Sequence, residues 1–350
     1  MLPEKQFLDN ALVITGGQEL TLADTGLISR GFQLVRQIDK EPEASFKDQG
    51  LEDAIRNLIQ KPNGPLILQD VNEIRMLNAS RRGIRSLSGI EKLTALEDLH
   101  CMGNKIEETT GLENLRNLRD LNLSHNLIAD IDKITNLKNL RKLHLGRNNI
   151  NKISEIGRLK KLTDLVLSYN QIQEIDVLEE LVSLEELHLM GNLISDLKVL
   201  KKLPKLKVLS LSNNRIKDIQ PLADLKNLRK LWLRNNQIID ISPIADLRNL
   251  ELLYLGSNKI REISGLEKLT ALRDLDLSDN RVTKIEPILE LNNLRELFLS
   301  DNEINNISGL IKLRNLAIVE ISHNPVDHII DPLTKLTFVR LAAKGCLIKP

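Results

Sequence analysis

An asparagine recurs every 22 residues through most of this chain. The recurring residues are Asn104, Asn126, Asn148, Asn170, Asn192, Asn214, Asn236, Asn258, Asn280, Asn302 and Asn324. The same spacing reaches back to Arg82 and forward to Cys346, which gives thirteen slots in one register. A unit of 22 residues cannot bury its own apolar face, whereas stacked units share a continuous core. The period therefore predicts a solenoid of stacked repeats.

Apolar residues hold fixed places around each asparagine. In one unit they are Leu162, Leu165, Leu167, Ile172, Ile175 and Leu178. The leucines before the asparagine alternate with polar residues, as in a short strand with one buried face. The apolar residues after it step by three, which suits a 3₁₀ or irregular segment. This frame is the leucine-rich-repeat signature, and it predicts an α/β solenoid with a parallel sheet on its concave face and short 3₁₀ or irregular segments on its convex face.

The asparagine itself has a structural role in this interpretation. It stands where the chain turns inward after the strand, and backbone groups at such a turn need hydrogen-bond partners. Its amide side chain both donates and accepts, so it can bridge its own turn and the neighbouring one. We assign the asparagines no catalytic role.

The chain divides into three parts. Residues 48–60 predict an amphipathic helix whose apolar face carries Leu51, Ala54, Ile55, Leu58 and Ile59. We expect an N-terminal extension over 1–45, a helical N-terminal cap over 46–70 and a leucine-rich-repeat domain over 71–350. Within the extension, 12–24 suggests a hairpin and 25–38 a helix, either as a packing element beside the cap or as a separate functional peptide.

The cap region resembles that of the bacterial internalin family. The matching residues are Phe46, Asp48, Leu51, Ala54, Ile55, Asp70, Val71, Ile74, Leu77, Gly83 and Ile84, and the resemblance runs from residue 46 to about 330. It implies a helical cap on the first repeat and a secreted surface protein that binds a host or partner protein. The repeat frame alone is also similar to the leucine-rich regulatory subunit of type-one serine/threonine phosphatases.

Composition and charge exclude several classes. Lys and Arg number 49 against 48 Asp and Glu, so the net charge of +1 does not indicate a nucleic-acid-binding protein. No apolar run approaches the roughly 18 residues of a membrane span. The start, MLPEKQFLDN, has no signal-peptide pattern, so we expect a cytoplasmic protein, with secretion by a route not visible in the sequence as the alternative. The distant Cys101 and Cys346 are expected to be reduced thiols.

Outward positions of the strands are where a solenoid carries function. One of these positions lies four residues before each asparagine slot, and in one repeat it holds Trp232, the single Trp of the chain. Aromatic residues make up only 2 % of the sequence. Aromatic and arginine side chains dominate interface energies, although aromatics also pack across strands of solvated sheets. The candidate partner-binding residues are Trp232, Tyr254, Phe298, Arg234, Arg229, Lys230 and Tyr169, with His144 and His188 as secondary candidates.

Neither catalysis nor a cofactor is indicated. His100, His144 and His188 share a column but stand two repeats apart, roughly 10 Å at the strand spacing, so they cannot share one zinc ion. The chain has no G-x-x-x-x-G-K-[ST] or G-x-G-x-x-G motif and no sign of a closed catalytic pocket. We therefore expect no catalytic residues, no metal site and no cofactor.

The sequence thus predicts a non-catalytic protein-recognition module that binds a partner protein on its concave face. The alternatives are a regulatory subunit of an enzyme such as a serine/threonine phosphatase, and a purely structural or engineered repeat scaffold, because 89–104 and 265–280 are closely similar. We expect a monomer. Residues 338–343 predict a last, open edge strand, which would allow end-to-end self-association as the alternative.

Overall fold

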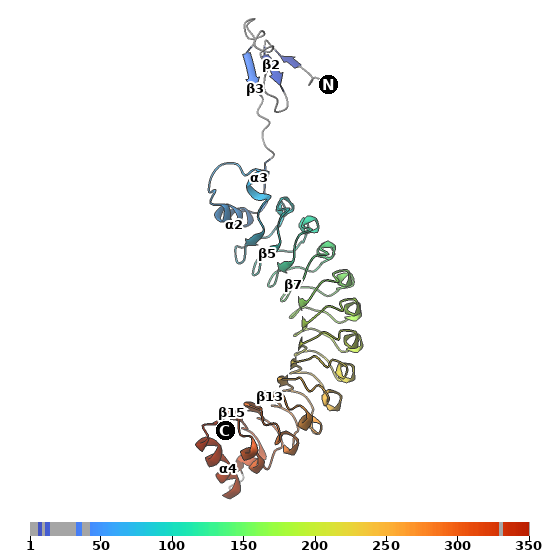
Figure 1. Ribbon diagram of the computed structural model, residues 1–350, viewed down its shortest axis with the longest axis vertical. Coiled ribbons are helices and arrows are strands. Elements are labelled where there is room, and N and C mark those ends of the chain that lie inside the picture. Colours follow the sequence, from blue (N-terminus) through green and yellow to red (C-terminus); the bar gives the residue numbers. More distant parts are fainter. Residues whose placement is uncertain (1–5, 9–10, 15–32, 37–42, 329–331, 350) are drawn as a thin grey trace.

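The chain is described here by a computed structural model, which defines residues 6–8, 11–14, 33–36, 43–328 and 332–349. Thirteen parallel strands follow one another in a single sheet, in chain order. Figure 1 shows these strands on the concave side of an arc and the 3₁₀ segments on its convex side. The predicted leucine-rich-repeat solenoid is confirmed. The strands are β4 (Met76–Asn78), β5 (Asp98–His100), β6 (Asp120–Asn122), β7 (Lys142–His144), β8 (Asp164–Val166), β9 (Glu186–His188), β10 (Val208–Ser210), β11 (Lys230–Trp232), β12 (Leu252–Tyr254), β13 (Asp274–Asp276), β14 (Glu296–Phe298), β15 (Ile318–Glu320) and β16 (Leu347–Lys349).

From β4 to β15, each strand buries its central residue and turns the two flanking residues toward the concave face. Leu231 is fully buried in β11, while Lys230 is exposed and Trp232 partly exposed. Pairing between β11 and β12 sets Leu231 opposite Leu253 and Trp232 opposite Tyr254. A slip of one residue would turn every leucine to solvent, so the apolar period fixes this register. Residues 22 apart therefore form straight columns along the concave face from β4 to β15.

The convex side consists of short 3₁₀ segments, as the steps of three predicted. In one repeat, the apolar residues that follow the strand, Ile172, Ile175 and Leu178, are all buried. The segments are η1 (Ile90–Lys92), η2 (Leu112–Asn114), η3 (Ile134–Asn136), η4 (Ile156–Arg158), η5 (Asp176–Glu180), η6 (Lys198–Lys202), η7 (Gln220–Leu222), η8 (Ser242–Ile244), η9 (Leu266–Lys268), η10 (Glu286–Ile288), η11 (Ser308–Lys312) and η12 (Pro325–His328).

The asparagine ladder ties neighbouring repeats together. Asn236 accepts a hydrogen bond from the Ile216 amide at 3.0 Å and donates to the carbonyls of Leu211 and Leu233, both at 3.0 Å. Ile216 and Leu211 belong to the preceding repeat, whereas Leu233 belongs to the same one. The same arrangement repeats from Asn104 to Asn324. These amides satisfy backbone groups that would otherwise be buried without partners, which is a structural role.

A helical cap covers the first repeat. Helix α2 (Gln49–Ile59) begins at Asp48, whose Oδ1 accepts from the Gly50 amide at 2.9 Å and whose Oδ2 accepts from the Arg85 amide at 2.8 Å. One carboxylate therefore caps the helix and joins it to the repeats. Leu51 and its neighbours Ala54 and Ile55 are buried as predicted, but Leu58 is 49 % exposed. The short helix α3 (Leu68–Val71) leads into β4.

The C-terminal end differs from the prediction. Residues 338–343 are not an edge strand but the second half of helix α4 (Pro332–Ala343), and the last strand is β16. Thr334, Thr337 and Leu341 are buried at spacings of three and four, a helical period that overrides the repeat register. Cys346 lies just before β16 and does not take the place of a ladder asparagine. Self-association through a strand at 338–343 is therefore excluded.

The N-terminal region contributes a separate three-stranded sheet. Strand β2 (Ala11–Ile14) pairs antiparallel with β1 (Gln6–Leu8) and parallel with β3 (Gln33–Arg36). The helix predicted over 25–38 is wrong for 33–36, which form β3, and its remainder lies outside the described residues. Most of the hairpin predicted over 12–24 also lies outside them. In the described parts of the chain, no helix has the length and apolar character needed to cross a membrane.

Candidate partner-binding face

Trp232 and Tyr254 form an aromatic pair on the concave face. They occupy the same column on β11 and β12, and each is partly exposed. Their ring centroids are 6.5 Å apart with an interplanar angle of 83°, an edge-to-face contact. This geometry is favourable for the ring quadrupoles and holds both side chains in fixed orientations.

A shallow hollow of about 630 Å³ lies beside this pair. Small side chains create the space, because Ser210 stands before Trp232 in the column and Ser212 lies two residues further on, both buried. The hollow is lined by His188, Met190, Ser210, Ser212, Asn213, Trp232, Arg234, Asn235, Tyr254 and Ser257. It therefore combines two aromatic rings with hydrogen-bonding groups and one guanidinium.

Arg234 is held in place by a carboxylate on β13, two repeats further along the solenoid. Its Nε lies 3.1 Å from Oδ2 of Asp276, a side chain that is only 4 % exposed. The pair spans the intervening repeat at Gly256, where a Cβ atom would approach Asp276 Oδ2 to 2.8 Å. Glycine at this position leaves room for the ion pair, and the pair fixes an arginine whose own side chain stays 50 % exposed.

The remaining basic candidates lie on the flank of the aromatic pair. Arg229 precedes β11 and reaches Glu251 at 3.7 Å, while its side chain remains 63 % exposed. Lys230 is exposed at the start of the same strand.

Burial, and secondarily the negative charge of Asp274, raise the pKa of the Tyr254 phenol above its ordinary value. Tyr254 therefore stays neutral at physiological pH and can donate a hydrogen bond.

Tyr169 and Phe298 do not join the aromatic pair. Tyr169 lies on the rim directly before a ladder asparagine, with a left-handed φ of 57°, and the guanidinium of Arg147 lies 4.3 Å from its ring centroid. In the next repeat, a Cβ atom at Gly191 would lie only 2.7 Å from Cδ1 of the Tyr169 ring, so glycine leaves room for this ring. Phe298 is on β14, and Asp276 stands between it and Tyr254 in the column.

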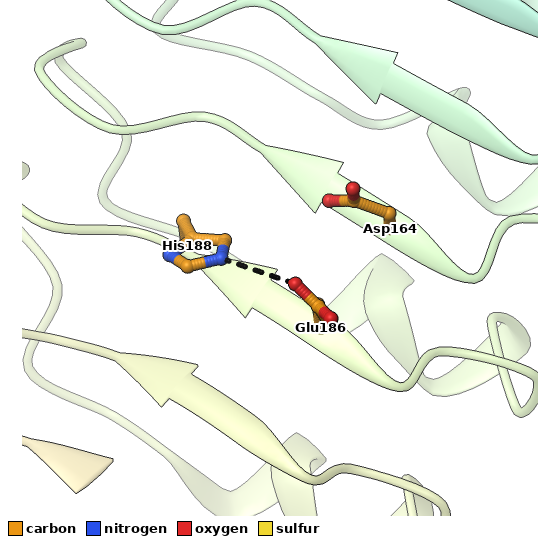
Figure 2. Close-up of side chains that lie close together, drawn as sticks. All are labelled: Asp164, Glu186 and His188. Carbon is orange, nitrogen blue, oxygen red and sulfur yellow. Dashed lines mark ion pairs between the residues drawn. The ribbon is translucent and has the colours of Figure 1, made fainter. Parts of the chain in front are cut away.

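His144 and His188 are partly exposed, and their column places them on alternate strands as predicted. His144 Nε2 lies 3.1 Å from Oδ2 of Asp164 on the next strand. His188 lines the hollow. It lies 3.9 Å from Glu186 of its own strand, and a dashed line marks this pair in Figure 2. The metal hypothesis drawn from the sequence combined the histidines only with one another, so it did not place Asp164 and Glu186 beside His188. The signal was present in the column six residues before each asparagine, which holds Asp164 and Glu186 in adjacent repeats.

Two family models match the repeats of this chain. The one described as "Leucine Rich repeats (2 copies)" matches residues 204–246 and 248–290, and the one described as "Leucine rich repeat" matches residues 138–194. With the parallel solenoid, these matches define a leucine-rich-repeat protein. A comparison with curated proteins gives no match.

Solved structures carry the likeness further, to the internalins. Internalin InlF of Listeria monocytogenes is 28 % identical with a TM-score of 0.78, covering 89 % of this chain and 98 % of that one. The functional domain of InlJ from Listeria monocytogenes is 25 % identical with a TM-score of 0.72, covering 79 % and 60 %. A leucine-rich-repeat protein of Leptospira interrogans is 25 % identical with a TM-score of 0.52, covering 81 % and 97 %. The chain is thus internalin-like, as the cap residues suggested.

These likenesses support a protein–protein interaction module, and folds of this type are typically non-catalytic.

Proposed function

We propose that this protein binds a partner protein on its concave face and that the hollow beside Trp232 and Tyr254 is the centre of the interface. The placement of the aromatic pair supports this proposal most strongly. In a chain with 2 % aromatic residues, two adjacent repeats present aromatic side chains outward and in contact with one another. Large aromatic side chains that are already ordered lose little conformational freedom on binding and dominate interface energies.

The surrounding charges would orient the partner. Arg234 is fixed by Asp276 beside the hollow, and Arg229 and Lys230 lie on its flank. Beyond Tyr254 the strands carry carboxylates at outward positions, among them Asp274, Glu296 and Glu320. A basic zone next to an acidic one favours a partner of complementary pattern and sets its direction along the solenoid.

The solenoid supplies rigidity for this role. Ladder asparagines and the continuous core hold every strand in one register, so the concave side chains keep fixed spacings before a partner arrives. The proposed mechanism is the presentation of a preorganised surface.

A comparative capture experiment tests the proposal. The full chain is immobilised as wild type, as Trp232→Ala and as Ile239→Ala, a matched control that removes an apolar side chain 64 % exposed away from the sheet. Loss of a hot-spot side chain is expected to weaken binding by at least about 2 kcal/mol, or about 30-fold. The proposal predicts that Trp232→Ala loses a partner which wild type and Ile239→Ala retain.

Two results would redirect the interpretation. If all three proteins retain the same partner equally, the hollow is not the interface. If the retained partner is an active phosphatase, the regulatory-subunit alternative holds, and the Trp232→Ala comparison shows whether it uses the same face.

A further inference from the structure

Two carboxylates and an imidazole converge on the concave face next to the hollow. Asp164 lies on β8, and Glu186 and His188 lie on β9, with Asp164 directly opposite Glu186 in the sheet register. One potential ligand atom from each residue lies within 4.8 Å of those from the other two. Figure 2 shows the three side chains projecting from the same side of the two neighbouring strands.

The Asp164 carboxylate has an unsatisfied oxygen. Its Oδ2 lies 3.1 Å from His144 Nε2, whereas its Oδ1 is buried and makes no hydrogen bond within the described part of the chain. A buried carboxylate oxygen without a partner is unfavourable, and such an atom in a folded protein calls for an explanation.

Within the described residues, this is the one group of three such side chains whose potential ligand atoms lie this close together. His100, His144 and His188 occupy equivalent positions at the ends of their strands. For each histidine, two residues can be compared: the first residue of its own strand and the first residue of the preceding strand. His188 has Glu186 on its own strand and Asp164 on the preceding one. The corresponding residue on the preceding strand is Met76 for His100. For His144, the corresponding residue on its own strand is Lys142. Among the three histidines, His188 is the one flanked by carboxylates at both positions.

We propose that Asp164, Glu186 and His188 bind a divalent transition-metal ion, for which Zn²⁺ is the best chemical fit. Zinc accepts imidazole nitrogen and carboxylate oxygen together, and three protein ligands leave a coordination position for water or for another ligand. His144 is a positioning residue, since its hydrogen bond to Asp164 fixes the orientation of that carboxylate. The positive charge of the ion would also compensate the Asp164 oxygen that has no hydrogen-bond partner.

Two features of the surroundings bear on the choice of ion. An imidazole ligand favours zinc, nickel or copper over magnesium and calcium, which prefer sites built wholly of oxygen. Lys142 lies opposite Asp164 on β7 and places a positive charge near the cluster, which opposes any cation, so the ion must be one that these ligands bind strongly.

His188 also lines the hollow, so the ion would lie at the edge of the proposed interface. A partner side chain could then occupy its open position. That consequence rests on the proposed function, whereas metal binding by the isolated chain does not.

Titration of the chelator-treated full chain with ZnCl₂ by isothermal calorimetry tests the site. The proposal predicts one ion per chain in the wild type and at least a ten-fold loss of affinity in His188→Ala and in Glu186→Gln. The matched control is His100→Ala, which removes an equivalent histidine from the same face and is expected to bind like the wild type. Circular dichroism of each variant establishes that the solenoid is folded.

Substitution by Co²⁺ adds an independent readout, because the visible absorption of bound cobalt reports its ligands. A cobalt spectrum that changes in His188→Ala and not in His100→Ala supports the assignment. Absence of saturable Zn²⁺ binding in the folded wild type, or equal affinities in His188→Ala and wild type, would overturn it. Failure of partner capture with zinc binding intact would count against the proposed function alone.

Discussion

Replacement of Asn236 by alanine probes how strongly the ladder holds neighbouring repeats together. In the wild type, the Oδ1 atom of Asn236 accepts from the Ile216 amide, and its Nδ2 donates to the carbonyls of Leu211 and Leu233. All three backbone groups belong to buried residues. The substitution removes these bonds and leaves the leucine packing around them unchanged.

The magnitude follows from what each backbone group retains. The carbonyl of Leu211 keeps a second donor, Asn214, and that of Leu233 keeps Asn258, both at 3.0 Å. Within the described part of the chain, the Ile216 amide has no such second bond. A buried amide without a partner costs about 1–3 kcal/mol, and each of the two lost carbonyl bonds contributes about 0.5–1 kcal/mol. The expected destabilisation of Asn236→Ala is therefore about 3 kcal/mol.

The assay is urea unfolding followed by circular dichroism, with Asn249→Ala as the matched control. Asn249 also donates to a backbone carbonyl of the preceding repeat, that of Lys226 at 2.8 Å, but it is exposed, so water replaces the lost bond. We expect the control to lose less than about 0.5 kcal/mol. Equal stability of the two variants would refute the assignment of the ladder as a buried structural network.

Three further predictions concern single side chains. Burial raises the pKa of the Cys101 thiol to about 12, so a thiol reagent at pH 8 is expected to modify Cys101 only after unfolding; modification of native protein at this residue would contradict its burial. Burial and then the charge of Asp274 raise the pKa of Tyr254, so this residue stabilises the folded state below the ordinary tyrosine pKa of about 10, and the contribution is lost as pH rises through its own higher pKa. An ultraviolet titration of wild type and Tyr254→Phe should place the lost ionisation step above that of free tyrosine, and a step at or below that of free tyrosine would argue against it. Finally, Leu341→Ala in α4 is expected to cost about 3 kcal/mol and Val339→Ala less than about 0.5 kcal/mol, since Leu341 is 1 % and Val339 65 % exposed; equal costs in urea unfolding would argue against the packing of α4 through Leu341.

The strictly periodic part of the fold was predictable because every repeat carries the same pattern of apolar and polar positions. Leucine alternation before Asn170 and steps of three after it were enough to predict the strand, the 3₁₀ segment and the outward columns. The C-terminal end was not predictable by extending the period, because helix α4 follows its own spacing of Thr334, Thr337 and Leu341. Once an element packs only on one neighbour, the repeat no longer dictates its conformation.

The candidate site was predictable in its columns and not in its pairings. Trp232 and Tyr254 lie side by side because they share a column, which the register gives directly. The contact between Arg234 and Asp276 spans two repeats over Gly256, and it depends on side-chain length and on the space that a glycine leaves. Such diagonal contacts follow from three-dimensional packing and have no fixed spacing in the sequence.

Hydroxyl-radical footprinting of the complex with its captured partner tests the central claim most directly, because it measures how accessible individual side chains are. The account predicts that oxidation of Trp232 and Tyr254 falls strongly on binding, while that of the exposed Ile239 is unchanged. Unchanged oxidation of both aromatic residues, with protection at Ile239 instead, would contradict recognition through the concave face.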